Sequence, residues 1–134
     1  MLSAFLRSQA DLPFAWGRTD CTSTAEGWVR LATGRAPIAA MGWSFASETE
    51  ALAILPRRGG LLAAMCLAMG RSGFSRTRQA SVGDVGLVVP ARTERACAAI
   101  LNEAGWVSRD ADGFILVPRD GRVLRAWRIA CPSR

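Results

Sequence analysis

A short stretch near the N-terminus holds the residues best suited to chemistry. In FAWGRTDCTS, residues 14–23, the pair Trp16-Gly17 shortly precedes Asp20-Cys21. Asp20 is suited to cap a following helix, which places Cys21 in its first turn. The positive end of the helix dipole and the unpaired N–H groups there favour a thiolate. Cys21 is therefore a candidate nucleophile.

A second interpretation of Cys21 stays open. The Asp20 carboxylate works partly against activation, because it disfavours a second negative charge nearby. Cysteine is also a common small core residue, and Gly17 then serves only a turn with positive φ. A nucleophile further needs a base that takes its proton.

The first half of the chain predicts helices that would position Cys21. Thr19 or Asp20 can cap a helix that runs to Thr33, and Gly34 is placed to end it. Its apolar face holds Cys21, Ala25, Trp28, Val29 and Ala32. Further helices are expected over residues 3–10, 47–55 and 61–69, with a loop over 35–45. Met65, Cys66 and Met69 on the last of these helices are expected core residues.

The second half predicts strands. Short runs rich in β-branched and aromatic residues cover 84–89, 96–101, 105–108, 114–117 and 123–131. Asp112-Gly113 and Asp120-Gly121 are typical of tight hairpin turns. These patterns predict an α+β fold in which N-terminal helices pack on one side of a small C-terminal antiparallel meander.

Length and composition predict one domain. The chain has 134 residues, half of them apolar, which suffices for a single core. No linker or internal repeat divides it. We expect one domain over 1–134, with a helical part over about 1–70 and a sheet part over about 82–131.

The net charge of +6 rests on arginine alone, because all 17 basic residues are Arg and the chain has no His. A basic surface attracts nucleic acid, anionic membranes or acidic proteins without choosing among them. Only Arg57-Arg58 and the group Arg71, Arg76 and Arg78 are dense enough to form a patch. No recognition helix or stacking aromatic pattern accompanies them. We therefore expect a solvated surface and no nucleic-acid partner.

The N-terminus lacks the features of a secretion signal, and the apolar run 61–69 is too short to cross a bilayer. We therefore expect no membrane span, and folding in the cytoplasm. The four cysteines, Cys21, Cys66, Cys97 and Cys131, are then expected as reduced thiols. Without His or a closely spaced Cys pair, we expect no metal site, and no motif points to a cofactor.

Two motifs carry a resemblance to a known family. PFAWGRTDCTSTAEGWV, residues 13–29, resembles the nucleophile segment of NlpC-type cell-wall cysteine peptidases, which are papain-like enzymes. SVGDVGLVV, residues 81–89, is similar to the Gly-Asp-hydrophobic strand that opens their sheet.

The whole chain also resembles a group of small proteins encoded by phages, prophages and gene-transfer-agent-like elements. The group shares the PF-x-WG-x-x-DC start, a TGRAP-like turn, a Gly-Gly-Leu segment, GDV and an AWRI-like strand. The resemblance implies a papain-like NlpC-type fold over nearly the full length of the chain.

This resemblance implies a site layout. Cys21 falls on the nucleophile, while Trp16, Gly17, Asp20, Gly83 and Asp84 match the signature of the fold and its groove. The general base of the family is a His that begins the strand after the Gly-Asp strand. Here that strand is RACAAIL, residues 95–101, so Ala96 or Cys97 stands approximately where the His would be.

The missing His removes the base. Papain-like catalysis needs a group that takes the thiol proton and later protonates the leaving amine. Arginine stays protonated, and a carboxylate such as Glu94 or Glu103 would raise the thiol pKa. We therefore expect the peptidase fold without peptidase activity.

The resemblance implies a structural role in a phage tail. Phage tails carry wall-cleaving domains at their tips, so a non-catalytic relative fits a tail-tip or hub-associated component. Its partners would be other tail proteins of the hub or baseplate, with peptidoglycan as a further contact. Its place would be the virion tail, after assembly in the cytoplasm of the host bacterium.

Two alternative functions stay open at this point. In the first, Cys21 is the nucleophile of a cell-wall peptidase whose base comes from a partner protein in the tail. Alternatively, the arginine-rich surface contacts DNA as the genome passes through the tail.

Overall fold

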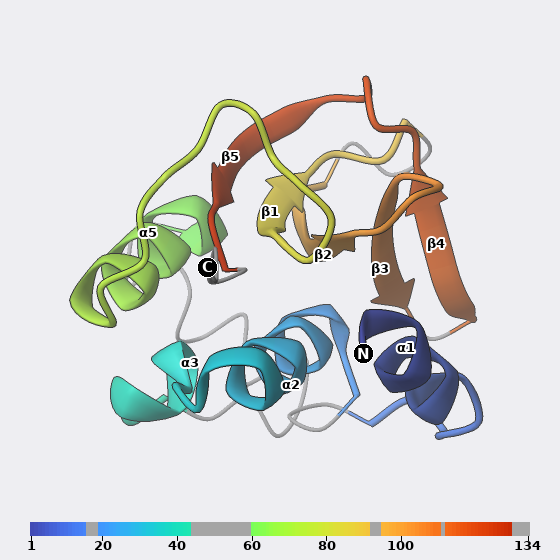
Figure 1. Cartoon of the computed structure of the whole chain (residues 1–134), viewed down its shortest axis with the longest axis horizontal. Coiled ribbons are helices and arrows are strands. Elements are labelled where there is room, and N and C mark those ends of the chain that lie inside the picture. The colour runs from blue at the N-terminus through green and yellow to red at the C-terminus, as the bar shows by residue number, and fades with distance from the viewer. Residues whose placement is uncertain (16–18, 44–59, 92–94, 111, 130–134) are drawn as a thin grey trace.

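Helices fill the first part of the chain and strands the second, in an α+β arrangement (Figure 1). The computed structural model describes residues 1–15, 19–43, 60–91, 95–110 and 112–129. The helices are α1 (Leu2–Ala10), α2 (Cys21–Thr33), α3 (Pro37–Ala40) and α5 (Gly60–Arg71). The strands are β1 (Val85–Val88), β2 (Cys97–Leu101), β3 (Trp106–Asp110), β4 (Gly113–Val117) and β5 (Val123–Trp127). The predicted fold class and the order of its two parts are confirmed.

Helix α2 begins and ends as the sequence predicts. Asp20 is its N-cap, and its Oδ1 accepts a hydrogen bond from the backbone N–H of Ser23 at 2.8 Å. Gly34 ends the helix with φ at 79°, which glycine adopts without strain. The predicted apolar face is confirmed, because Ala25, Trp28 and Val29 are buried and Cys21 and Ala32 pack against the same core.

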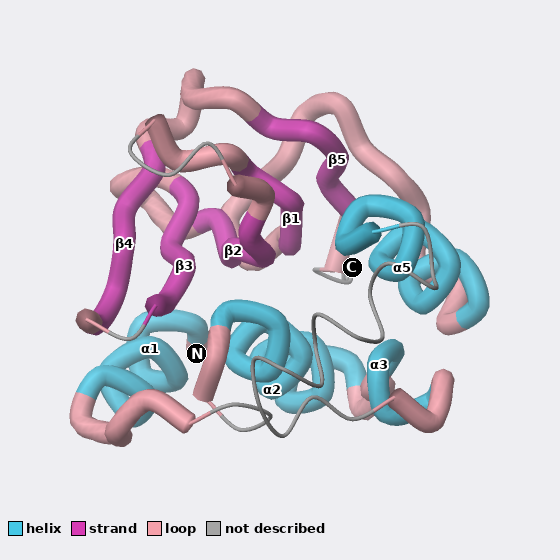
Figure 2. The backbone as a smooth tube through the Cα atoms, turned by 180° about the vertical axis from the view of Figure 1, so that it is seen from behind, coloured by secondary structure: helices cyan, strands magenta, loops and turns pink. Residues whose placement is uncertain are grey.

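The strands form one antiparallel sheet in the order β4-β3-β2-β1-β5 (Figure 2). The Asp112-Gly113 turn joins the paired strands β3 and β4, as predicted. The prediction for Asp120-Gly121 is wrong: the chain turns there, but β5 pairs with β1 at the far side of the sheet. The meander therefore ends at β4. Strand order depends on which edge offers a partner, and a local turn signal does not encode that choice.

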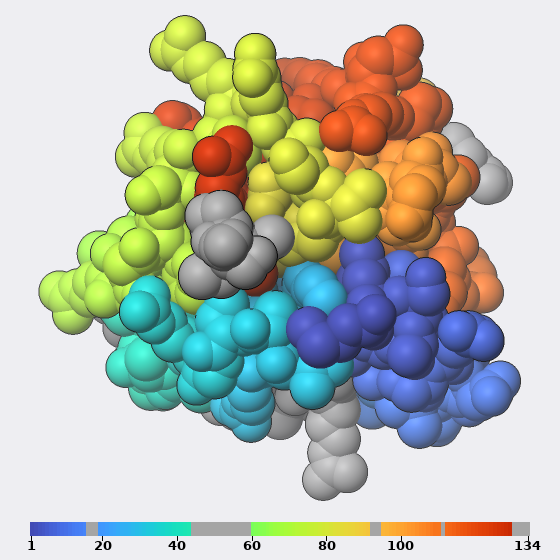
Figure 3. All heavy atoms as spheres, in the orientation of Figure 1, coloured from blue at the N-terminus to red at the C-terminus, as the bar shows by residue number. Residues whose placement is uncertain are grey.

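The sheet has two buried faces. Its inner face meets α1, α2 and α5, as Figure 1 shows. On the surface in Figure 3, the blue and cyan N-terminal residues lie below the yellow and orange strand residues. The strand residues of this core are Val85, Leu87, Ala98, Ile100 and Trp127. The outer face carries a second cluster, made of Val88, Ala99, Leu101, Trp106, Val117 and Ala126. Successive residues of a strand point to opposite faces, so the alternation assigns each strand side chain to one of the two clusters.

Some predicted boundaries change. The predicted loop 35–45 contains the short helix α3, whose first N–H groups, those of Ile38 and Ala39, donate to the Glu26 carboxylate of α2. Helix α5 continues through Gly70 to Arg71, and β5 ends at Trp127 rather than at residue 131. The predicted helix 47–55 and its capping box lie outside the described residues.

Among the described residues, none of the helices combines the length and the apolar character that crossing a bilayer requires.

Candidate functional site

The turn that leads into Cys21 is closed by Thr19. Its hydroxyl donates to the carbonyl of Pro13 at 2.7 Å and accepts from the backbone N–H of Ala15 at 2.6 Å. The N–H of Thr19 also donates to the Ala15 carbonyl at 2.8 Å. These bonds fix Pro13, Ala15 and Thr19 relative to one another. Trp16 and Gly17 lie outside the described residues.

Cys21 is the first residue of α2, as predicted, and it faces the start of β2. Burial raises the pKa of Cys21 to about 11, and a hydrogen bond with the Ala98 backbone only partly offsets this effect. Nearby Cys97 and Asp20 raise the pKa further, whereas the Thr22 hydroxyl, 3.8 Å from the Cys21 sulfur, lowers it. Desolvation therefore outweighs the helix dipole, and Cys21 is a neutral thiol near neutral pH.

Cys97 comes close enough to Cys21 for their charges to interact, but its side chain packs against the outer cluster. Burial raises its pKa, a hydrogen bond with Ser108 lowers it, and Asp110 raises it. On β2 it is Ala98 that belongs to the inner core beside α2. Ala96 and Cys97 are the two positions predicted for the missing base. By strand alternation, Ala96 faces the same side of the sheet as Ala98, whereas Cys97 faces the opposite side.

No described carboxylate replaces the base. Glu103 is exposed in the turn after β2, at the end of the strand opposite to Ala98. The strand between Ala98 and Leu101 alone spans about 10 Å. Glu94 lies outside the described residues. Ser108 is buried, and its hydroxyl donates to the Ala98 carbonyl at 2.7 Å. Its observed bond therefore stabilises the β2–β3 pair.

Gly83 and Asp84 form a structural clamp. The Asp84 side chain is fully buried and accepts two backbone hydrogen bonds, from Ser81 at 2.8 Å and from Ile129 at 2.9 Å. The Gly83 carbonyl accepts the indole N–H of Trp28 at 2.8 Å. The motif thus ties α2 to the start of β1 and to the chain after β5. Its backbone pairs with Leu101, at the end of β2 opposite to Ala98 and Cys21. The hydrogen bonds of the clamp therefore serve the fold.

Arg109 is a positioning residue that the sequence analysis missed. It is 6% exposed, and its guanidinium donates to the carbonyls of Gln9, at 2.8 Å, and Leu12 at the C-terminal end of α1. A cation is favourable at that end of a helix. Arg109 therefore ties β3 to the segment that leads into the Thr19 turn. In the sequence, Arg109 only follows the predicted strand 105–108, and its partners Gln9 and Leu12 are 100 and 97 residues away.

The described residues contain no group of three or more His, Cys, Asp or Glu side chains suited to hold a metal ion. The thiols of Cys21, Cys66 and Cys97 are free.

The chain belongs to the family described as Domain of unknown function (DUF6950), whose sequence profile matches residues 1–129. No curated protein and no solved structure gives a significant match to the chain.

Proposed function

We propose that this member of the DUF6950 family has a papain-like, NlpC-type fold and is a non-catalytic structural component of a phage tail, at the tail tip or hub. The tail assignment rests on the resemblance of residues 13–29, of residues 81–89 and of the further shared motifs to proteins of phages and related elements. The chemistry at Cys21 adds a second line of support.

The observation that carries the loss of catalysis is the environment of Cys21. Its thiol has a pKa of about 11, lies against the backbone of Ala98 and is close to Cys97, one of the two positions where the resemblance places the missing base. The chain contains no histidine. A neutral thiol without a base is a poor nucleophile.

The arrangement around Cys21 also supports the fold assignment. The cysteine begins a helix that packs on an antiparallel sheet, and it meets the strand that follows the Gly-Asp strand. This is the order of parts that the NlpC resemblance implies. The retained Thr19 turn and the Asp84 clamp keep this scaffold in shape without any catalytic step.

The test is quantitative mass spectrometry of purified particles from a bacterium that carries the encoding element. We expect peptides of this protein at a constant copy number per tail, and enrichment in tail fractions over capsid fractions. Particles that lack the protein, while it accumulates in the lysate, would refute the tail assignment.

A further inference from the structure

The chain between α5 and β1 adds a short edge to the sheet beside β5. Arg76 forms an isolated antiparallel bridge with Trp127 of β5. The N–H of Thr77, the next residue, donates to the Ala126 carbonyl at 2.9 Å. Residues 75–77 therefore run alongside the end of β5 and form the last backbone of the sheet on this side.

The backbone of Arg76 points away from β5. When the hydrogen bonds of an antiparallel pair flank two opposite residues, the N–H and C=O groups of those two residues point outward. Here the flanking bonds are that of Thr77 and that of Arg128, whose N–H donates to the Ser75 carbonyl at 2.8 Å. Among the described residues, the N–H and C=O of Arg76 have no hydrogen-bond partner. The edge thus presents a donor and an acceptor that suit a further strand.

A groove lies along this edge. It has a volume of about 360 Å³. The side chains that line it are all polar, and none of those described is acidic: they belong to Ser75, Arg76, Thr77, Arg78, Gln79 and Arg128. The groove leaves room beside the free backbone of Arg76.

Three arginines share one face of this edge. Alternate residues of a strand lie on the same face, so Arg76 and Arg78 lie together. Arg76 is opposite Trp127 of the inner core. Arg125 of β5 is opposite Leu87, which belongs to the same core. All three arginines therefore lie on the side of the sheet that faces α5.

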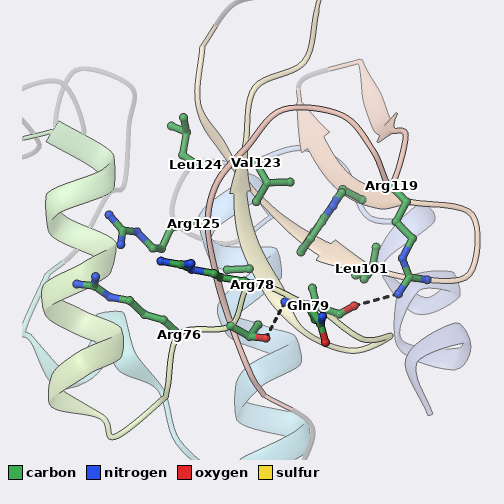
Figure 4. A pocket seen from close by; sticks show the side chains of 12 residues that line it. Arg76, Arg78, Gln79, Leu101, Arg119, Val123, Leu124 and Arg125 are labelled. Atoms are coloured by element: carbon green, nitrogen blue, oxygen red, sulfur yellow. Dashed lines mark hydrogen bonds between the residues drawn. The ribbon is translucent and has the colours of Figure 1, made fainter.

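The charges of these three arginines are not offset. Figure 4 shows the pocket that they line with Arg119, and their guanidinium groups extend toward α5. None of the three side chains has a hydrogen-bond or ion-pair partner among the described residues. The Nε of Arg125 is buried without a partner. Like charges on neighbouring strands repel one another, and carboxylates on this face would offset that repulsion.

We infer that this edge binds an extended acidic segment of a partner protein, which adds to the sheet as a strand beside residues 75–78. Its backbone pairs with the N–H and C=O of Arg76. Its carboxylates, at alternate positions, meet Arg76 and Arg78, with Arg125 on the next strand behind them. Both strands have a side-chain period of two, so acidic and basic side chains come opposite one another.

Backbone chemistry favours a peptide over a nucleic acid at this edge. Strand addition satisfies both an N–H and a C=O of the edge, and it is a recurring mode of peptide recognition. Phosphate oxygens only accept hydrogen bonds, so a phosphate backbone leaves the C=O of Arg76 unpaired.

The inferred partner is represented by a short, capped, fluorescent peptide in which Glu and Thr alternate. Anisotropy titration with the full chain at low ionic strength should give saturable binding that weakens as salt is added. A peptide of the same composition with its Glu residues contiguous should bind about tenfold more weakly, because its carboxylates do not share one face. Equal affinities would reduce the interaction to net charge and overturn the added strand.

N-methylation of alternate residues of the peptide tests the backbone pairing. Successive N–H groups of a strand point to opposite sides, so only one of the two alternating sets faces the edge. We expect methylation of that set to abolish binding and methylation of the other set to preserve it. Binding that survives both methylations, or is lost with both, would overturn strand addition.

The matched variants are Arg76→Gln, Arg78→Gln and Arg30→Gln. All three side chains are exposed, and Arg30 lies on α2, away from this edge. We expect each edge variant to weaken binding of the alternating peptide about tenfold, and Arg30→Gln to leave it within about twofold. Equal losses in all three variants would contradict a site at this edge.

A short DNA duplex serves as the competing ligand. We expect that the duplex does not displace the alternating peptide. Displacement, with loss of duplex binding in the Arg78→Gln variant, would overturn the acidic segment in favour of a nucleic-acid surface.

Discussion

At the residue scale, the sequence predicts where Cys21 lies but not what state its thiol is in. The cap at Asp20 and the stop at Gly34 are local signals, and both are confirmed. The pKa of Cys21 depends on how completely β2 covers the sulfur, which is a tertiary property. A helix start alone predicts a lowered pKa, and the structure gives the opposite direction.

The raised pKa of Cys21 predicts a loss of stability in alkali. Below pH about 9 both the folded and the unfolded chain keep the thiol proton. Between about 9 and about 11 the unfolded chain releases it while the folded chain retains it, so the free energy of unfolding falls as pH rises. The total loss is about 2.5 kcal/mol.

Urea unfolding of the wild type and of Cys21→Ala across this pH range measures the effect. The difference in stability between the two proteins should shift steadily in favour of the alanine variant as pH rises. Parallel pH profiles would contradict the raised pKa, since all other titrating groups are common to both proteins.

At the element scale, most helices and strands follow from apolar periodicity and turn residues, whereas their pairing does not. The Asp112-Gly113 hairpin forms as predicted. Asp120-Gly121 carries the same signal, yet β5 crosses to β1, where Trp127 joins the inner core and Ala126 the outer cluster. We infer that β5 takes this position because side chains on both of its faces become buried there. The Asp120-Gly121 turn signal contains no information about that burial.

Gly86 on β1 shows how closely the outer face is packed. A Cβ at this position would lie 2.9 Å from the Cη2 and Cζ3 atoms of the Trp106 ring and 3.1 Å from the Arg125 carbonyl oxygen. The ring is buried and held in the outer cluster, so it cannot move away freely. We expect Gly86→Ala to reduce the free energy of unfolding by about 1–3 kcal/mol.

Gly70→Ala is the matched control for this prediction, measured in the same urea titration. Gly70 lies in α5, and a Cβ there meets open space. Alanine is the better helix former, so this variant should be more stable than the wild type by up to about 1 kcal/mol. A Gly86→Ala protein as stable as Gly70→Ala would contradict the packing described for Trp106.

At the scale of the whole molecule, Cys21 and the arginines of the sheet lie at different places. Cys21 packs against the inner face, and burial keeps its thiol neutral near neutral pH. Arginines that are far apart in sequence gather along the β5 edge of the sheet. The sequence analysis singled out Arg76 and Arg78 but missed Arg119 and Arg125, because only the crossing of β5 brings them to one pocket.

The central claim, a peptidase-like scaffold without peptidase activity, is tested most directly by hydrolysis of purified peptidoglycan fragments. Wild type and Cys21→Ala are compared alone and together with tail particles that lack the protein, and the released peptides are quantified by mass spectrometry. We predict that neither protein releases peptides above the level of the buffer or of the particles themselves. Release by the wild type that disappears in Cys21→Ala would contradict the account, and release only with particles would assign the missing base to a tail partner.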